Sequence, residues 1–186
     1  RHDDGTTFLL TGDIPAMWLR DSTAQLRPYL ALAAEDSDIA SLIAGLIRQQ
    51  FRYIIIDPYA NAFNEESNGA SWDKDDRSDF SSPWLWERKY EVDSLCYPIQ
   101  LAWMLYANTG NADHFDAEFI AGVKKILDVF ETEQHHERSP YFFIRDTDIP
   151  TESLSNNGKG SPVAYTGMTW SGFRPSDDAC TYHYLV

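Results

Sequence analysis

The sequence predicts an all-α protein, and three stretches support that prediction. Between residues 39 and 54, apolar side chains recur every three or four positions, which is the period of a helix with one buried face. Residues 95–106 are apolar on nearly every side, as in a helix buried among others, whereas residues 117–134 have one apolar and one charged face. A fully buried helix followed by a one-sided helix is typical of concentric layers of helices.

The first helical pattern spans residues 26–34, where Pro28 predicts a kink or an early boundary. The second pattern begins at Asp36 or Ser37, both of which are residue types that cap helices, and it ends before Pro58. Its regular apolar face indicates a role in packing.

The helical period then disappears in residues 59–84, which are rich in Asn, Asp and Ser. A loop of this length in a compact domain is either functional or mobile. Asn64 stands beside Phe63 and is a candidate ligand contact, while residues 73–79 are better explained as a solvated loop tip.

Two more helices and a strand are predicted in the remainder of the chain. One helix follows residues 84–94, where charges alternate with aromatic side chains, and ends near Gly110; the next covers residues 117 to about 134. Residues 141–146 predict a short strand, and residues 147–162 a loop whose Asn and Gly residues favour turns.

Length and composition limit the class of protein. The 186 residues are 43% hydrophobic, which suffices for one sizeable core. We expect residues 1–186 to be a single truncated domain, because the chain lacks an initiator Met and stops inside an apolar run. No run approaches the length of a membrane span, so no membrane partner is expected.

The net charge and the cysteines limit the class of ligand and the cell compartment. A net charge of −14, from 29 acidic and 15 basic residues, disfavours nucleic acid as a partner and fits a neutral ligand. Cys96 and Cys180 are too few for a disulfide scaffold and indicate buried thiols. They favour a reducing, cytoplasmic location.

Aromatic and charged side chains are concentrated in residues 165–180, which include Trp170, Arg174, Asp177 and Asp178. A pyranose has apolar C–H faces that stack on aromatic rings, and hydroxyls that carboxylates and guanidinium groups bind. The stretch therefore predicts a sugar site in which one of the adjacent carboxylates donates a proton. The Ser-Asp-Asp sequence is equally that of an ordinary helix start, where the helix dipole would stabilise the ionised carboxylate.

The segment TGDIPAMWLRDS, residues 11–22, adds further candidates. It places Asp13, Arg20 and Asp21 in a stretch that otherwise has an interior character, next to Trp18. Charges in such a place need partners, and Arg20 is suited to pair with a carboxylate bidentately, through two parallel N–H···O bonds. A buried ion pair that only fixes the turn explains the same pattern.

The stretch of residues 84–98 contributes Trp86 as a stacking surface and Glu87 and Asp93 as candidate sugar contacts, although each of them could instead be structural. No His, Cys, Asp or Glu residues have the spacing of a metal site, and no HExxH motif occurs. We therefore expect neither a metal nor another cofactor.

Taken together, three strings resemble glycoside hydrolase family 125, the metal-independent exo-α-mannosidases that cleave α-1,6-linked mannose. They are TGDIPAMWLRDS, WERKYEVDSLCYP and TGMTWSGFRPSDDAC, with IDPYANAFN at residues 56–64 between the first two. The resemblance implies an (α/α)6 toroid, of which this chain would form about half, with the active site where the loops gather. It also implies a mannose-containing oligosaccharide or glycan as substrate.

The resemblance implies an inverting mechanism with two carboxylates. The proton donor corresponds to Asp177, with Asp178 as the alternative, and the general base lies downstream, outside this chain. We therefore expect the 186-residue chain alone to be inactive. Two rival functions stay open at this stage: an inverting hydrolase of another α-glycoside on the same fold, and a sugar-binding protein that performs no reaction.

Overall fold

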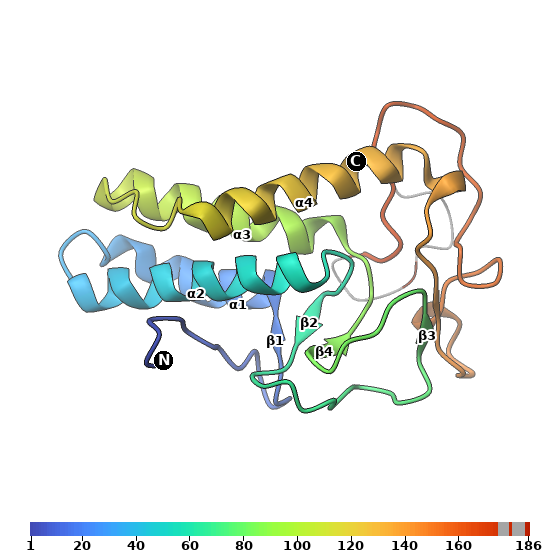
Figure 1. Ribbon diagram of the computed structural model, residues 1–186, viewed down its shortest axis with the longest axis horizontal. Helices are drawn as coiled ribbons and strands as arrows, with labels where there is room; N and C mark the ends of the chain where they lie inside the picture. Colours follow the sequence, from blue (N-terminus) through green and yellow to red (C-terminus); the bar gives the residue numbers. More distant parts are fainter. Residues whose placement is uncertain (175–178, 180–184) are drawn as a thin grey trace. The chain divides into compact units, whose positions relative to one another are not determined.

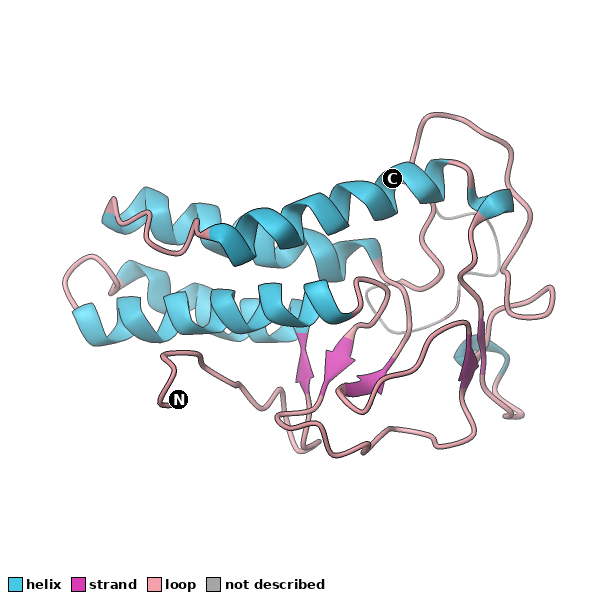
Figure 2. Cartoon of the chain, viewed as in Figure 1, coloured by secondary structure: helices cyan, strands magenta, loops and turns pink. Residues whose placement is uncertain are grey.

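The computed structural model describes residues 1–174, 179 and 185–186, and this part of the chain is mostly helical (Figures 1 and 2). Its α-helices are α1 (Leu19–Leu26), α2 (Ser37–Ile56), α3 (Val92–Thr109) and α4 (Ala117–Gln134). Short 3-10 helices are η1 (Arg27–Ala31), η2 (His136–Arg138) and η3 (Pro150–Glu152). The strands are β1 (Met17–Trp18), β2 (Ala62–Phe63), β3 (Arg77–Ser78), β4 (Leu85–Glu87) and β5 (Phe143–Ile144).

The contacts between residues divide the chain into two compact units. Unit 1 comprises Arg1–Pro58 and Asp93–Ile126, and unit 2 comprises Tyr59–Val92 and Leu127–Val186. Unit 1 therefore contains α1, α2, nearly all of α3 and the first part of α4, while unit 2 contains β2 to β5. One domain can consist of two such units, so the single domain stays a prediction.

The start of α2 is set by its cap. The Asp36 carboxylate accepts hydrogen bonds from the backbone N–H groups of Asp38, at 2.9 Å, and Ile39, at 3.2 Å. These bonds satisfy two donors that have no partner inside the helix. The helix ends at Ile56, because Pro58 disfavours a helical conformation in the residue before it. Both predicted boundaries of this helix are confirmed.

The first helix lies earlier in the chain than the pattern over residues 26–34 predicts. α1 ends at Leu26, and the chain continues through Pro28 as the 3-10 helix η1. A proline inside an α-helix removes one backbone hydrogen bond and clashes with the preceding turn. The early boundary predicted at Pro28 is confirmed.

Gln50 joins α1 to α2 in the core of unit 1. Its side chain is fully buried, and its amide nitrogen lies within hydrogen-bond distance of three acceptors: Leu19 O at 3.1 Å, Ser22 Oγ at 2.9 Å and Thr23 Oγ1 at 2.9 Å. A buried amide is tolerated in a core only when such partners are present. The contact therefore fixes how α1 is placed on α2.

α2 and α4 approach each other closely at a glycine. The Phe51 and Phe119 rings lie 4.4 Å apart, and a Cβ atom on Gly122 would lie 2.5 Å from the Phe51 ring. Gly122 is therefore required by packing, since any side chain there would displace that ring.

Two predictions about buried faces are wrong in the described structure. α3 was expected to be buried on every side, but Trp103 is 61% exposed and Tyr106 is 38% exposed. The apolar face predicted in residues 117–134 is also partly open on α4, where Ile120 and Leu127 are 49% and 59% exposed. The hydrophobic period predicts which apolar side chains share a face of a helix, but it does not specify what covers that face.

The cysteine prediction fails for the one described thiol. Cys96 on α3 is exposed rather than buried, and Cys180 lies outside the described residues. Cys96 lies in the first turns of α3, two residues before Pro98. Isolated cysteines give little information about burial, because their position is decided by neighbours distant in sequence.

The length and hydropathy of α2 bear on the prediction that the protein has no membrane partner. The prediction that no run approaches the length of a membrane span is wrong for α2, which by length and composition alone could cross a membrane, with a mean hydropathy of 1.2 over 18 residues, half of them buried. Core helices of globular proteins meet the same criterion.

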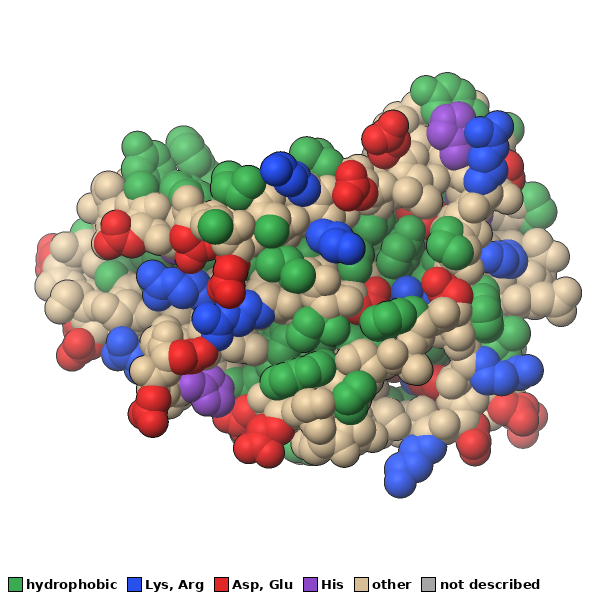
Figure 3. Space-filling model, viewed as in Figure 1, with side chains coloured by type: hydrophobic (Ala, Val, Ile, Leu, Met, Phe, Trp, Pro, Cys, Tyr) green, Lys and Arg blue, Asp and Glu red, His purple; other side chains and the backbone are tan. Residues whose placement is uncertain are grey.

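On the face of the molecule drawn in Figure 3, acidic and basic side chains are interspersed rather than gathered by sign.

Unit 2 contains the long loop, which is more ordered than its composition suggests. Residues 59–84 include β2 and β3, so the prediction of a structureless loop is wrong. β2 pairs antiparallel with β4, placing Ala62 opposite Glu87, and β3 pairs antiparallel with β5, placing Arg77 opposite Ile144. The strand predicted in residues 141–146 is confirmed as β5.

The second predicted loop, residues 147–162, is confirmed, with η3 as a single helical turn within it. Near its end Asn156 and Asn157 have φ values of 53°, and Gly158 has a φ of 81°. Such left-handed conformations favour Asn and Gly over other residues. The Lys159 ammonium group lies 2.9–3.1 Å from the carbonyl oxygens of residues 139, 140 and 141 and ties the loop to the chain before β5.

We expect Gly122→Ala to destabilise the full-length protein by about 1–3 kcal/mol, because the added methyl group overpacks against Phe51. An exposed helical glycine would behave in the opposite way and gain about 0.5–1 kcal/mol from the same change. The measurement is the free energy of unfolding by chemical denaturation. The control is Ala121→Gly at the exposed neighbouring position, and a stabilised Gly122→Ala variant would contradict the close approach.

Candidate active site

In unit 1, Arg20 brings together two of the motifs singled out in the sequence. Its side chain is 13% exposed, with Nη2 3.1 Å from Asp21 Oδ2 and Nη1 3.7 Å from Asp93 Oδ2. Arg20 lies in the first turn of α1 and Asp93 in the first turn of α3. The carboxylate partner that the sequence required for Arg20 is therefore present, and a second one comes from a distant part of the chain.

The Asp93 carboxyl group is partly buried, and one of its oxygens accepts no hydrogen bond from the described residues. Its side chain is 18% exposed, and burial raises its pKa although the charge of Arg20 opposes the rise. Oδ2 is itself buried and has no hydrogen-bond partner among the described residues, since Arg20 Nη1 is too distant for one. A buried carboxylate oxygen in this state is suited to accept a hydrogen bond from a ligand hydroxyl.

Trp18 and Asp13 occupy different environments close to this cluster in sequence. Trp18 precedes α1 and is 8% exposed, and its indole N–H has no hydrogen-bond partner within the described ranges. Its backbone N–H donates to Thr11 Oγ1 at 3.3 Å, which fixes the turn. Asp13 is exposed in that turn, and its contact with a sugar stays a prediction.

In unit 2, Glu87 is held by donors from several segments. Its Oε1 accepts from Arg145 Nη2 at 3.0 Å, its Oε2 accepts from Asn61 Nδ2 at 2.9 Å, and Lys89 Nζ lies 3.6 Å from Oε1. Glu87 is only 6% exposed. This carboxylate is engaged in fixing β4, which differs from the predicted role of gripping a sugar.

Arg145 is the centre of that network. The guanidinium group is 4% exposed, donates to both carboxylate oxygens of Asp76 at 2.7 and 2.6 Å, and donates to Glu152 at 2.8 Å. Burial works against its charge, but the carboxylates of Asp76 and Glu87 more than offset this and raise its pKa. Burial also works against the Glu152 charge, yet Lys89 and Arg145 hold the Glu152 pKa below its ordinary value.

Sequence reasoning missed the Arg145 network. The available signal was a charged residue closing the apolar run Tyr-Phe-Phe-Ile, which is unusual at the end of a buried strand. Asp76, which lies in the stretch interpreted as a solvated loop tip, is in fact its bidentate partner. Nothing in the local pattern could have identified that pair.

Asn64 serves the loop rather than an open site. It is 1% exposed, and its amide nitrogen lies within hydrogen-bond distance of three backbone carbonyls, those of Ala70, Pro83 and Leu85, at 2.7, 3.2 and 3.3 Å. A buried amide used in this way stabilises an irregular loop. The structure does not support the predicted sugar contact at Asn64.

Trp86 is half-buried in β4 and remains a candidate surface for stacking. Its carbonyl accepts a hydrogen bond from Trp72 N at 2.9 Å, which attaches the long loop to the strand. Its indole N–H is buried and lacks a hydrogen-bond partner in the part of the chain described here.

Trp170 is in the core of unit 2 and does not present an open ring face. It is 2% exposed and stacks on the His136 ring with 3.5 Å between centroids. His136 is fixed by Glu133 Oε2, 2.7 Å from Nδ1, and by Lys159 O, 2.6 Å from Nε2. The prediction of Trp170 as a sugar-stacking surface is therefore not supported, because its exposure depends on contacts that a local pattern does not reveal.

Asp177 and Asp178, the two candidate acids, lie outside the described residues, as does the Ser176 cap. The segment that leads to them is anchored by Phe173, whose N–H donates to Tyr90 O at 3.0 Å. Arg174 follows and is exposed. Its predicted contact with substrate stays a prediction.

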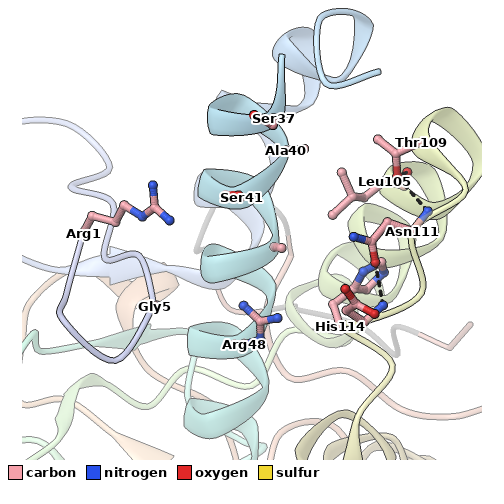
Figure 4. Close-up of a pocket in the computed structure, with 12 residues that line it drawn as sticks. Arg1, Gly5, Ser37, Ala40, Ser41, Arg48, Leu105, Thr109, Asn111 and His114 are labelled. Carbon is pink, nitrogen blue, oxygen red and sulfur yellow. Dashed lines mark hydrogen bonds between the residues drawn. The ribbon is translucent and has the colours of Figure 1, made fainter. Parts of the chain in front are cut away.

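A cavity of about 270 Å³ within unit 1 contains none of the predicted site residues (Figure 4). Its polar groups serve the turn after α3, since Asn111 N donates to Thr109 Oγ1 at 3.1 Å and Asp113 N donates to Asn111 Oδ1 at 2.7 Å. The cavity is lined by Arg1, Gly5, Ser37, Ala40, Ser41, Ala44, Arg48, Leu105, Thr109, Asn111, Asp113 and His114.

Acidic side chains do converge in unit 2, but they do not form a metal site. Asp76, Glu87 and Glu152 all approach Arg145, whose positive charge occupies the space between them. Across the described ranges, no group of three or more His, Cys, Asp or Glu residues is placed to hold a metal ion.

Comparisons with known proteins identify the family. The family model for metal-independent alpha-mannosidases, GH125, matches residues 1–186. The Meiotically up-regulated gene 157 protein of Schizosaccharomyces pombe is 38% identical over 196 residues, which cover 97% of this chain and 38% of that protein. A Streptococcus pneumoniae structure from a family of metal-independent alpha mannosidases, in a non-productive complex with alpha-1,6-mannobiose, is similar with a TM-score of 0.96 and 55% identity.

That similarity covers 100% of this chain and 43% of the Streptococcus pneumoniae chain, so the chain spans less than half the length of both relatives. The resemblance predicted from the three sequence motifs is thereby confirmed, and the chain belongs to the GH125 family of metal-independent alpha-mannosidases.

Proposed function

We propose that the intact protein hydrolyses terminal non-reducing α-1,6-linked mannose from an oligosaccharide or glycan, with inversion at the anomeric carbon. The observation that carries this proposal is the likeness to the alpha-1,6-mannobiose complex at 55% identity over the whole of this chain. The same likeness supports an (α/α)6 toroid, to which this chain would contribute about half.

The Arg20 cluster supplies suitable chemistry for holding the sugar. Asp21 and Asp93 lie beside the guanidinium group and limit its orientations, which would hold its planar fork of donors at a fixed place next to the mannose hydroxyls. The buried Asp93 Oδ2 would accept a hydrogen bond from a hydroxyl in return. A neutral polyol such as mannose has hydroxyl groups that can accept from Arg20 and donate to Asp93.

Hydrolysis itself requires two carboxylates on opposite faces of the sugar ring, about 6.5–9.5 Å apart in inverting enzymes. In this proposal Asp177 protonates the departing glycosidic oxygen, with Asp178 as the alternative donor. A second carboxylate, from polypeptide beyond this chain, activates the water. The 186-residue chain by itself would then bind sugar at most and would not turn it over.

The reaction is tested by incubating the full-length protein with α-1,6-mannobiose and following the first product by NMR. We expect β-mannose to appear before mutarotation, because attack by water from the face opposite the leaving group inverts an α-linkage. Initial α-mannose would overturn the inverting mechanism. Faster release of glucose from isomaltose would overturn the choice of mannose.

We expect Asp177→Asn to lower kcat by about 10²–10⁴-fold, because an amide cannot supply the proton that general acid catalysis requires. Binding of α-1,6-mannobiose, measured by calorimetry, should be retained. The matched control is Asp178→Asn in the same full-length protein. A larger loss in the control would reassign the acid to Asp178, and equal activity of both variants with the wild type would remove both from catalysis.

We expect Arg20→Lys to lower kcat/KM on α-1,6-mannobiose by about ten- to a hundred-fold, the equivalent of about 1.5–3 kcal/mol for hydrogen bonds to a charged group. Lysine keeps the positive charge but loses the planar fork of donors. Arg27→Lys, at an exposed position in η1, is the control and should leave kcat/KM unchanged. Unaltered kinetics in the Arg20 variant would rule out its role in holding the sugar.

A further inference from the structure

Two positions beside the proposed acid in sequence are held by backbone hydrogen bonds within unit 2. Phe173 N donates to Tyr90 O at 3.0 Å, and Ala179 N donates to Thr151 O at 2.7 Å. Phe173 and Ala179 also pair with each other in an antiparallel bridge. The chain between them, residues 174–178, therefore begins and ends at two fixed points that face each other.

Residues 174–178 include both candidate acids of the proposed function, Asp177 and Asp178, which lie outside the described residues. Asp178 is bonded to Ala179, and Asp177 is the residue before it. Consecutive Cα atoms are about 3.8 Å apart, so no residue can lie further from a fixed neighbour than its covalent links allow. Whatever holds Phe173 and Ala179 therefore limits the places that either carboxylate can reach.

One buried ion pair lies against both of these fixed points. Lys89 is 2% exposed, and its Nζ donates to Glu152 Oε2 at 2.8 Å. The same ammonium group lies 5.4 Å from the centroid of the Phe173 ring. Glu152 follows Thr151 in η3, and the Thr151 carbonyl is the one that accepts from Ala179. Lys89 thus contacts Phe173 directly, and through Glu152 it contacts the segment that holds Ala179.

Phe173 is fully buried and is held through its backbone as well as its ring. The ring packs edge-on against Phe143 of β5, with 5.4 Å between centroids and 88° between planes. The Phe173 carbonyl accepts from Ser171 Oγ at 3.0 Å, and Val92 N donates to the same hydroxyl at 3.1 Å. Because a close-packed interior has little free space, a shift of Lys89 would be passed on to Phe173.

The ion pair is charged at neutral pH. Burial works against the Glu152 charge, but the hydrogen bonds and charges of Lys89 and Arg145 lower the pKa of its carboxyl group below the ordinary value. The pair is therefore complete under the conditions of an activity assay.

We propose that the Lys89–Glu152 ion pair is a positioning element for the catalytic acid. It holds Phe173 and Ala179, between which the acid lies in sequence, and so sets the distance from the acid to the glycosidic oxygen that it protonates. Neither member of the pair touches the substrate in this role. The inference rests on the proposed function, because it assumes that Asp177 or Asp178 donates the proton.

The test compares Glu152→Gln with Asp76→Asn in the full-length protein. Both changes remove a carboxylate from the buried Arg145 guanidinium group, so both should lower the midpoint of chemical denaturation. Of the two carboxylates, only that of Glu152 also accepts from Lys89 in the described structure. On α-1,6-mannobiose we expect Glu152→Gln to lower kcat about ten- to a hundred-fold with KM unchanged, since a small misplacement of a catalytic group has an effect of this size. Asp76→Asn should keep the wild-type kcat.

A second substrate separates placement of the acid from a general loss of structure. α-Mannosyl fluoride has a leaving group that departs with little help from a proton donor, so acid catalysis contributes little to its hydrolysis. We expect Glu152→Gln to hydrolyse the fluoride within about two-fold of the wild-type rate. A variant that is merely less stable would lose the same fraction of its activity on both substrates.

A second variant changes the other member of the pair. Lys89→Met keeps a side chain of similar length but removes the charge, while Glu152 keeps its hydrogen bond from Arg145 at 2.8 Å. It should show the same pattern as Glu152→Gln: a lower kcat on mannobiose and nearly unchanged hydrolysis of the fluoride.

Three results would overturn the positioning role: wild-type kcat on mannobiose in both variants, equal losses on mannobiose and on the fluoride, or the same loss of kcat in Asp76→Asn. The proposed hydrolysis fails in a different way. If the wild type releases no mannose from either substrate, the reaction is absent and the positioning role is lost with it. An active wild type with unaffected variants removes the positioning role alone.

Discussion

The described part of unit 2 depends on one buried guanidinium group, that of Arg145. It connects the long loop through Asp76, β4 through Glu87 and η3 through Glu152, three segments that are distant in sequence. Removing any one carboxylate would leave a buried charge partly unpaired, which is far less favourable than never having buried the group. The loop has little regular structure of its own, since β2 pairs with β4 and β3 with β5 through two residue pairs each. The ion pairs of Arg145 therefore fix the course of the loop.

A second arginine, Arg20 in unit 1, also lies beside two carboxylates, with Asp21 Oδ2 at 3.1 Å and Asp93 Oδ2 at 3.7 Å. Arg145 donates to three carboxylates at hydrogen-bond distance, whereas Asp93 Oδ2 accepts no hydrogen bond within the described residues. That carboxylate oxygen can therefore accept a hydrogen bond from a ligand hydroxyl. The cluster around Arg145 is therefore structural, whereas the cluster around Arg20 is a candidate for binding a ligand.

The sequence predicted the helices well because their signals are local. The Asp36 cap, Pro58 and the apolar period fixed α2, and the same period placed α4 at Ala117–Gln134. β2 and β3 could not be predicted, since they lie in a polar stretch without an apolar run like that which predicted β5, and they form only through partners elsewhere in the chain. The same distinction applies to the predicted site. The pairing of Arg20 with a carboxylate followed from its charge, but the burial of Trp170 and the hydrogen bonds of Asn64 to backbone carbonyls depend on tertiary contacts.

The loop that ends near Gly160 has the composition of a flexible linker, yet its length is closely constrained. Successive left-handed residues from Asn156 to Gly158 must stay at fixed positions, and Lys159 must reach three carbonyl oxygens at once. Inserting or deleting a single residue would move the lysine off its acceptors and force unsuited side chains into left-handed conformations. Variation in this loop should therefore occur by substitution at constant length, and a tag or a fusion placed here would disturb the chain that precedes β5.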